Sequence, residues 1–227
     1  IIGDSALERC SGTPSTVAKV KERLQRAQNS LDYMENDAAL GHLRAAERAT
    51  SCSTDRVAAE TLARSQFLSG LIMFNEGKKD DARTAWRQAL VVQSDLQWDQ
   101  NFEPSGQPIF EDVRANMQYE AKAQLRVLPA TKDAVSINGQ PMDTTAEVMG
   151  GTHLLQVTDT QTRTMWLKLT AGDSPTVLVP SLFPADLTGL VSTPESRQAL
   201  HETLSLLEKD RTIVVLTPDS AWKSTSG

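Results

Sequence analysis

Residues 135–157, VSINGQPMDTTAEVMGGTHLLQV, decide the fold class because helical periodicity gives way here to strand periodicity. Apolar residues alternate at the start of the stretch and run into Asn138-Gly139, a dipeptide typical of two-residue hairpin turns. Gly150-Gly151 then precedes HLLQV at 153–157, which reads as another strand. The stretch therefore predicts a small antiparallel β-module.

Further strands are expected on both sides of this stretch. Alternating residues at 125–129 predict the first strand of the module, and those at 165–169 and 176–179 predict its last two. After a loop at 181–192, Thr193-Pro194 suits the start of a helix that carries Leu200 and Leu204. A strand at 212–216 follows, and this helix–strand unit is either an appendage to the module or the start of a third domain.

The chain before residue 125 shows helical spacing almost throughout. Ser15 or Thr16 is available to cap a first helix, Ser53-Thr54-Asp55 to cap a third, and Gly77 suits the end of that third helix. Two helices repeat one pattern of small, large and small residues at the same offsets, 43 positions apart. The pattern is formed by Ala39, Leu43 and Ala46 and again by Ala82, Trp86 and Ala89.

These patterns predict an α+β chain of two domains. Residues 1–124 form a helical-hairpin array, with a last helix reaching to about residue 124 as a cap. Residues 125–180 form a small antiparallel β-sandwich, and residues 181–227 form the helix–strand appendage and tail. A generic antiparallel helical bundle is the alternative for the first part.

Composition restricts the partners. The 227 residues carry a net charge of −6, with 16 basic against 18 acidic residues before Pro129 and 7 against 11 from there on. Neither part is a basic nucleic-acid footprint, and attraction to an anionic membrane surface is not expected. No apolar run has the length of a membrane span. Because the chain starts at Ile1, any signal peptide or anchor is expected to lie outside it.

Two cysteines, Cys10 and Cys52, sit beside small polar residues, whereas buried structural cysteines usually have apolar neighbours. A disulfide between them is expected, which indicates an oxidising compartment, and two free thiols are the alternative. Without nearby histidines they make no metal-ligand set.

The helical repeat resembles the tetratricopeptide repeat through Gly70, Ala82, Trp86 and Ala89, with Ala27 at the position equivalent to Gly70. Its usual aromatic falls on Gln66 and Arg23, and the spacing exceeds the family's 34 residues. The resemblance implies a concave groove that binds a peptide or helix. The groove positions that it implies are Lys21, Gln28, Arg64, Phe67, Leu71, Phe74 and Asn75. Alternatively, Phe67 and Phe74 fill the core.

The β-module resembles the PEGA domain, although the eponymous tetrapeptide is absent. The residues that carry the resemblance are Val135, Ile137, Asn138-Gly139, Gly151, His153, Leu155 and Val157. Together the two resemblances imply a non-enzymatic adaptor of the Gram-negative envelope, periplasmic or otherwise exported. Such a protein would bind partners in a multiprotein surface, motility or secretion machine. A cell-wall or polysaccharide-binding module is the second hypothesis, for which Trp166 and Trp222 are the available aromatics.

No catalytic motif, cofactor site or metal site is predicted. His42, His153 and His201 are scattered. The acidic pair Asp80-Asp81 is expected in a turn between helices and Glu111-Asp112 at a helix start, and both places suit acids that cap unpaired backbone N–H groups. An enzyme with converging histidine and acidic side chains is a third possibility.

Overall fold

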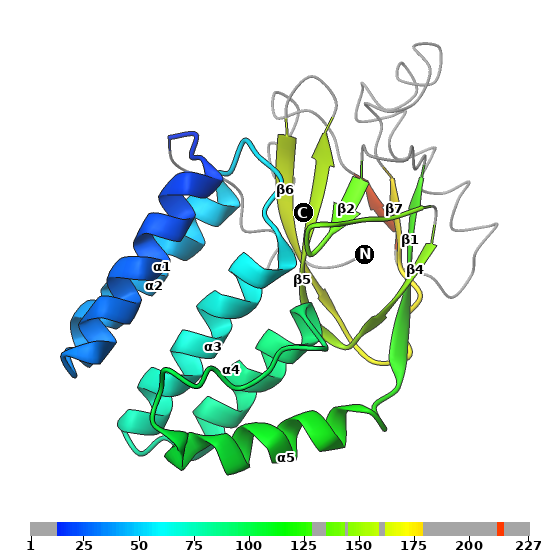
Figure 1. Cartoon of the computed structure of the whole chain (residues 1–227). Coiled ribbons are helices and arrows are strands. Elements are labelled where there is room, and N and C mark those ends of the chain that lie inside the picture. The colour runs from blue at the N-terminus through cyan, green and yellow to red at the C-terminus, as the bar shows by residue number, and fades with distance from the viewer. Residues whose placement is uncertain (1–12, 129–134, 144, 159–161, 179–212, 216–227) are drawn as a thin grey trace, which may run out of the picture.

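The computed structural model describes residues 13–128, 135–143, 145–158, 162–178 and 213–215. Within them, five α-helices come first and a β-rich part with two sheets follows (Figure 1). The expected mixture of helix and sheet, helices first, is confirmed at this level. The expected helix after residue 193 lies outside the described residues.

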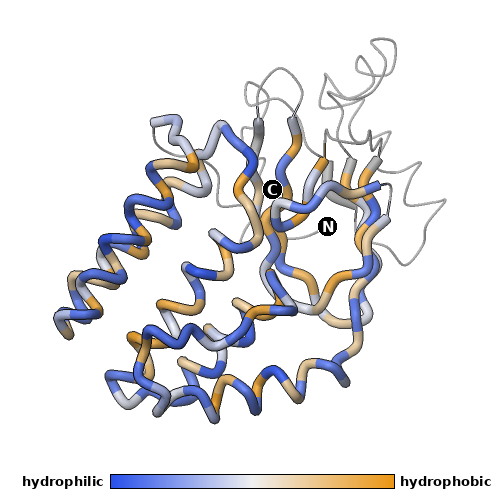
Figure 2. Tube along the Cα trace, in the orientation of Figure 1, coloured by the Kyte–Doolittle hydropathy of each residue, from blue (hydrophilic) through white to orange (hydrophobic). Residues whose placement is uncertain are grey.

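Four helices form two hairpins, and a fifth lies against the second hairpin (Figure 1). The helices are α1 (Val17–Asp32), α2 (Asn36–Ser51), α3 (Ala59–Asn75), α4 (Lys79–Val92) and α5 (Gln107–Met117), with a short 3-10 turn at Pro104–Gly106. Hydrophilic and hydrophobic residues alternate along these helices, as amphipathic helices require (Figure 2). The last helix ends at Met117, so the expected cap is shorter than predicted.

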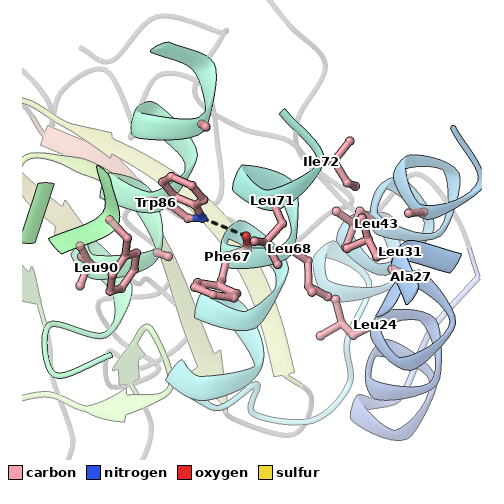
Figure 3. Close-up of a cluster of buried hydrophobic side chains, with 14 of the residues drawn as sticks. Leu24, Ala27, Leu31, Leu43, Phe67, Leu68, Leu71, Ile72, Trp86 and Leu90 are labelled. Atoms are coloured by element: carbon pink, nitrogen blue, oxygen red, sulfur yellow. Dashed lines mark hydrogen bonds between the residues drawn. The ribbon is translucent and has the colours of Figure 1, made fainter. Parts of the chain in front are cut away.

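The repeated pattern of small and large residues forms the contact inside each hairpin. All six of its residues, Ala39, Leu43, Ala46, Ala82, Trp86 and Ala89, are buried. In the second hairpin Gly70 of α3 lies directly against the Trp86 ring, where a Cβ would come within 2.3 Å of Trp86 Nε1. That nitrogen donates a hydrogen bond of 3.2 Å to the Phe67 carbonyl (Figure 3). Glycine thus allows the indole to approach the α3 backbone.

Helix termini agree with the sequence at α1 and differ at α3. Thr16 caps α1 by accepting from the Lys19 amide, as expected. However, α3 begins at Ala59 with no side-chain cap, so the prediction that 53–55 cap it is wrong. Asp55 instead accepts from the Val17 amide and so helps to cap α1. These polar residues serve a helix that is distant in sequence, which local spacing cannot show.

Two four-stranded sheets follow, in the orders β4-β1-β7-β8 and β3-β2-β5-β6. The strands are β1 (Lys122–Leu128), β2 (Val135–Ile137), β3 (Gln140–Pro141), β4 (Thr145–Met149), β5 (Gly151–Thr158), β6 (Thr162–Leu169), β7 (Thr176–Leu178) and β8 (Ile213–Val215). Between them lies a core with residues of both sheets, among them Leu125, Val177, Leu155 and Leu167.

The expected antiparallel arrangement is wrong for one sheet. The β3-β2-β5-β6 sheet is antiparallel throughout, but β1 pairs with β7 and β7 with β8 in parallel. These parallel neighbours are far apart in sequence, so no turn signal reports them. The strand expected at 212–216 is present as β8, and it extends the sheet of the β-module.

Candidate functional site

The residues expected to line a groove have unequal access to solvent. Lys21 and Asn75 are exposed, whereas Gln28, Arg64 and Phe74 are half-buried. Phe67 and Leu71 are buried in the helical core (Figure 3). These two side chains fill the core, which was the alternative for Phe67, and they do not line an open groove.

The chain itself covers this part of α3. The segment between α4 and α5 crosses the second hairpin (Figure 1). It brings the Trp98 ring to 5.3 Å from the Phe67 ring and 5.6 Å from that of Trp86. Phe110 of α5 lies 5.7 Å from Phe67, so edge-to-face aromatic contacts close the surface. A partner protein bound at this face of the helices would therefore contact the polar residues around the aromatic cluster and not its apolar interior.

Arg64 holds this arrangement together. Its guanidinium donates to the Asp99 carboxylate at 2.6 Å and to the Gln28 side-chain oxygen at 2.7 Å, which links α3, the covering segment and α1. Burial tends to raise the pKa of Asp99, but hydrogen bonds from Asn101 and Arg64 outweigh it, and the pKa lies below its ordinary value. Two of the expected groove residues are thus joined to each other.

The tip of the first hairpin carries exposed apolar side chains. Tyr33 and Met34 are 80% and 87% exposed, and Met34 adopts a positive φ of 59° between α1 and α2. The tip is the end of this hairpin remote from the sheets (Figure 1). Sequence analysis did not single these residues out, although an aromatic and a methionine in a helix–helix turn are a usable signal.

A second region, which the sequence did not indicate, is the junction between the helices and the antiparallel sheet. The Gln156 side chain of β5 accepts from the Val57 amide at 2.8 Å and donates to the Asp55 carbonyl at 3.0 Å. The Gln88 amide of α4 exchanges two hydrogen bonds with the backbone of Thr152. Side chains of each part thereby satisfy backbone groups of the other.

Apolar contacts reinforce the junction. Val57, Leu62 and Leu154 form a buried cluster, against which Trp166 packs. The Trp166 indole also donates to the Ser51 hydroxyl at 3.0 Å. Consequently β5 is buried on both faces, one toward the other sheet and one toward the helices. The apolar pair Leu154-Leu155 in HLLQV, which breaks strict alternation, is the signal that could have revealed this.

A cleft of about 380 Å³ lies at this junction. Thr152, Trp166 and Lys168 line it from the sheet, Ser65 and Gln66 from α3, and Glu47 from α2. Its volume is at the lower end of the range of small-molecule sites.

The histidines occupy separate environments. In β5, His153 is buried; its Nε2 donates to the Met149 carbonyl at 2.8 Å and its Nδ1 accepts from the Asn138 amide at 2.9 Å, a tautomer assigned from these partners. Burial lowers the pKa of His153, although the hydrogen bond to Met149 opposes this. His42 is half-buried on α2, and His201 lies outside the described residues.

Cys52 follows α2 directly and is disulfide-bonded. Its expected partner, Cys10, lies outside the described residues, so that pairing stays a prediction. Ser15 and Ser53 form a parallel β-bridge beside it, which joins the segment before α1 to the start of the α2–α3 connection. In the described part of the chain no group of three or more His, Cys, Asp and Glu side chains is placed to hold a metal ion.

The acidic pairs differ from their expected positions. Asp80-Asp81 lie in the first turn of α4 but make no side-chain capping bond. Glu111-Asp112 lie inside α5 rather than at its start, because that helix begins at Gln107. Glu111 pairs with Arg114, and Asp112 pairs with Arg83 of α4. Through Asp112, the second pair therefore ties α5 to the α3–α4 hairpin.

Comparison with protein-family models, curated proteins and solved structures returned no match for this chain. Among the helices that the structure describes, none is both long and apolar enough to cross a membrane.

Proposed function

We propose that this protein is a non-enzymatic, protein-binding adaptor of the bacterial cell envelope. Its helical part, similar to tetratricopeptide repeats, presents the binding surface, and its PEGA-like β-module acts as a docking or spacer unit. The partners are proteins of a multiprotein surface, motility or secretion assembly.

The exposed hairpin tip is the observation that carries this proposal. Tyrosine and methionine contribute strongly to protein interfaces, tyrosine through a rigid amphipathic ring and methionine through a flexible thioether. Tyr33 and Met34 lie side by side in the α1–α2 turn and leave most of their surface in solvent. The exposed Lys21 and the half-buried Gln28 belong to α1 of the same hairpin.

Two further observations support the role and the compartment. The hydrogen bonds of Gln88 and Gln156 fix the hairpins on the sheet, so the tip projects from a rigid base, which lowers the entropy cost of binding. The disulfide of Cys52 supports an oxidising compartment such as the periplasm.

Affinity capture from the envelope fraction of the source cell tests the proposal. The full chain is compared with a tip variant, Tyr33→Ser/Met34→Asn, in which asparagine tolerates the positive φ. Tyr119→Ser is the matched control, because Tyr119 is 82% exposed but lies after α5. We expect one or more proteins to be enriched by the wild type and the control and lost with the tip variant. Equal enrichment by all three would refute the assignment of the surface to the tip.

A further inference from the structure

The cleft at the helix–sheet junction has a floor formed by one face of the antiparallel sheet. Thr152 and Lys168 are paired across β5 and β6, and Trp166 stands two residues from Lys168, so all three side chains share that face. Leu155 and Leu167 point the other way, into the core between the sheets. A bound molecule would therefore lie over the face of the sheet.

The position of the cleft over the face of the sheet favours a compact ligand over an extended peptide. An extended peptide that adds to a sheet needs the backbone groups of an edge strand. β6 is the edge strand of its sheet, but the cleft lies over the face of the sheet, and its lining residues come from the sheet, α2, α3 and α4. A compact molecule recognised by side chains fits this better than a peptide strand.

The walls are fixed, and some polar groups remain available. Gln88 is held by the Thr152 backbone, Thr50 by the Ala46 carbonyl, and Trp166 by Ser51. By contrast, the half-buried side chains of Ser65 and Gln66 have no hydrogen-bond partner within the described ranges. Together they offer a hydroxyl and an amide, both of which donate and accept.

The charges of the lining oppose each other. Glu47 and Lys168 contribute one charge of each sign, and the other lining residues are neutral. A polyanion such as a nucleotide would need several cationic donors, usually including arginine. The lining thus favours a ligand without net charge.

We propose that this cleft binds a neutral sugar ring. The Trp166 indole provides an apolar surface for the C–H groups of the ring, while Ser65 and Gln66 exchange hydrogen bonds with its hydroxyls. The end of Lys168 reaches the outer hydroxyls. This site is remote from the hairpin tip and does not depend on the protein-binding role.

Titration of the ¹⁵N-labelled full chain followed by NMR tests the site. The probes are glucose and N-acetylglucosamine, each up to on the order of 10 mM, which is sufficient for weak sites. Inorganic phosphate and a short alanine-rich peptide serve as competing chemistries. We expect saturable shifts of the Thr152 and Gln66 amides with at least one sugar and none with phosphate or peptide.

Variants then separate binding from folding. Gln66→Ala removes a half-buried amide without a partner, so the fold should persist, and the sugar Kd should rise about two- to tenfold. Gln118→Ala, at an exposed position after α5, is the matched control and should leave Kd unchanged. Absence of saturable shifts with both sugars, shifts with phosphate or peptide alone, or an equal Kd for Gln66→Ala and the wild type would overturn the proposal.

Discussion

The close contact between Gly70 and Trp86 leads to a prediction about stability. Gly70→Ala should destabilise the wild type but stabilise a variant that has leucine at position 86. Gly70→Ala adds a methyl group where the Trp86 ring already lies, within 2.3 Å of its nitrogen. The first hairpin solves the same packing problem with Ala27 and Leu43, both buried. Gly70→Ala combined with Trp86→Leu therefore recreates in the second hairpin the pair found in the first.

The magnitudes follow from two opposing terms. Overpacking a well-packed core costs about 1–3 kcal/mol, while replacing glycine by alanine inside a helix gains up to about 1 kcal/mol. In the wild-type background Gly70→Ala should thus lower the free energy of unfolding by about 1–2 kcal/mol. With leucine at 86 the clash is absent, so the same substitution should raise it by about 0.5–1 kcal/mol. The coupling between the two positions is then about 1.5–3 kcal/mol.

Urea unfolding of the four proteins in this cycle measures the coupling, with the slope of the transition checked for constancy. Trp86→Leu alone should be destabilised, because it leaves a cavity and removes the bond to the Phe67 carbonyl. The decisive quantity is the sign change of Gly70→Ala between the two backgrounds. If that substitution had the same effect in both, the close approach would not be the reason for the glycine.

Three further predictions concern the β-module and its attachment. Because burial lowers the pKa of His153, the folded state favours the neutral ring. The contribution of this ring to the free energy of unfolding is therefore complete above the unfolded pKa of about 6.5 and declines as pH falls below that value. In His153→Gln, the urea midpoints at pH 7.5 and 5.5 should show that this part of the acid sensitivity is lost. Gln156→Leu leaves the buried Val57 amide without its partner and should cost about 1–3 kcal/mol, whereas a change below about 0.5 kcal/mol in urea unfolding would contradict that role. A reductant should lower the thermal midpoint of the wild type, since opening the disulfide of Cys52 removes about 2–4 kcal/mol; Cys52→Ser should be insensitive, and two reactive thiols in the unreduced, denatured wild type would refute the bond.

Much of the helical part could be predicted because its contacts are local in sequence. The offsets of Ala39, Leu43 and Ala46 and their repetition at Ala82, Trp86 and Ala89 report faces of single helices, and the main partner of each face is the neighbouring helix of the same hairpin. The Thr16 cap and the positive φ of Gly77, 78°, are local features as well. Periodicity and turn chemistry determine such features directly.

The parts that could not be predicted depend on contacts between distant residues. Asp55 is polar and follows Ser53-Thr54, so it has the pattern of a cap for the next helix, yet it serves α1. The parallel pairing of β1 with β7 joins strands about fifty positions apart (Arg126 with Thr176), and no turn specifies it. Phe67 has a suitable position for a groove, but Trp98 and Phe110 come from a later segment and cover it. Leu71 is buried in the same core.

At the junction between the helices and the sheet, two polar residues have roles that a hydrophobicity pattern does not predict. Gln88 and Gln156 are the residues that a hydrophobicity pattern assigns to solvent, yet each bonds to backbone groups of the opposite part. A glutamine amide can donate and accept at once, so it can replace a missing strand or helix neighbour at an edge. Burial of both faces of β5 follows from these bonds. The helical hairpins and the sheet are therefore held together by specific side-chain contacts. These contacts also fix the positions of the residues that line the cleft beside Trp166.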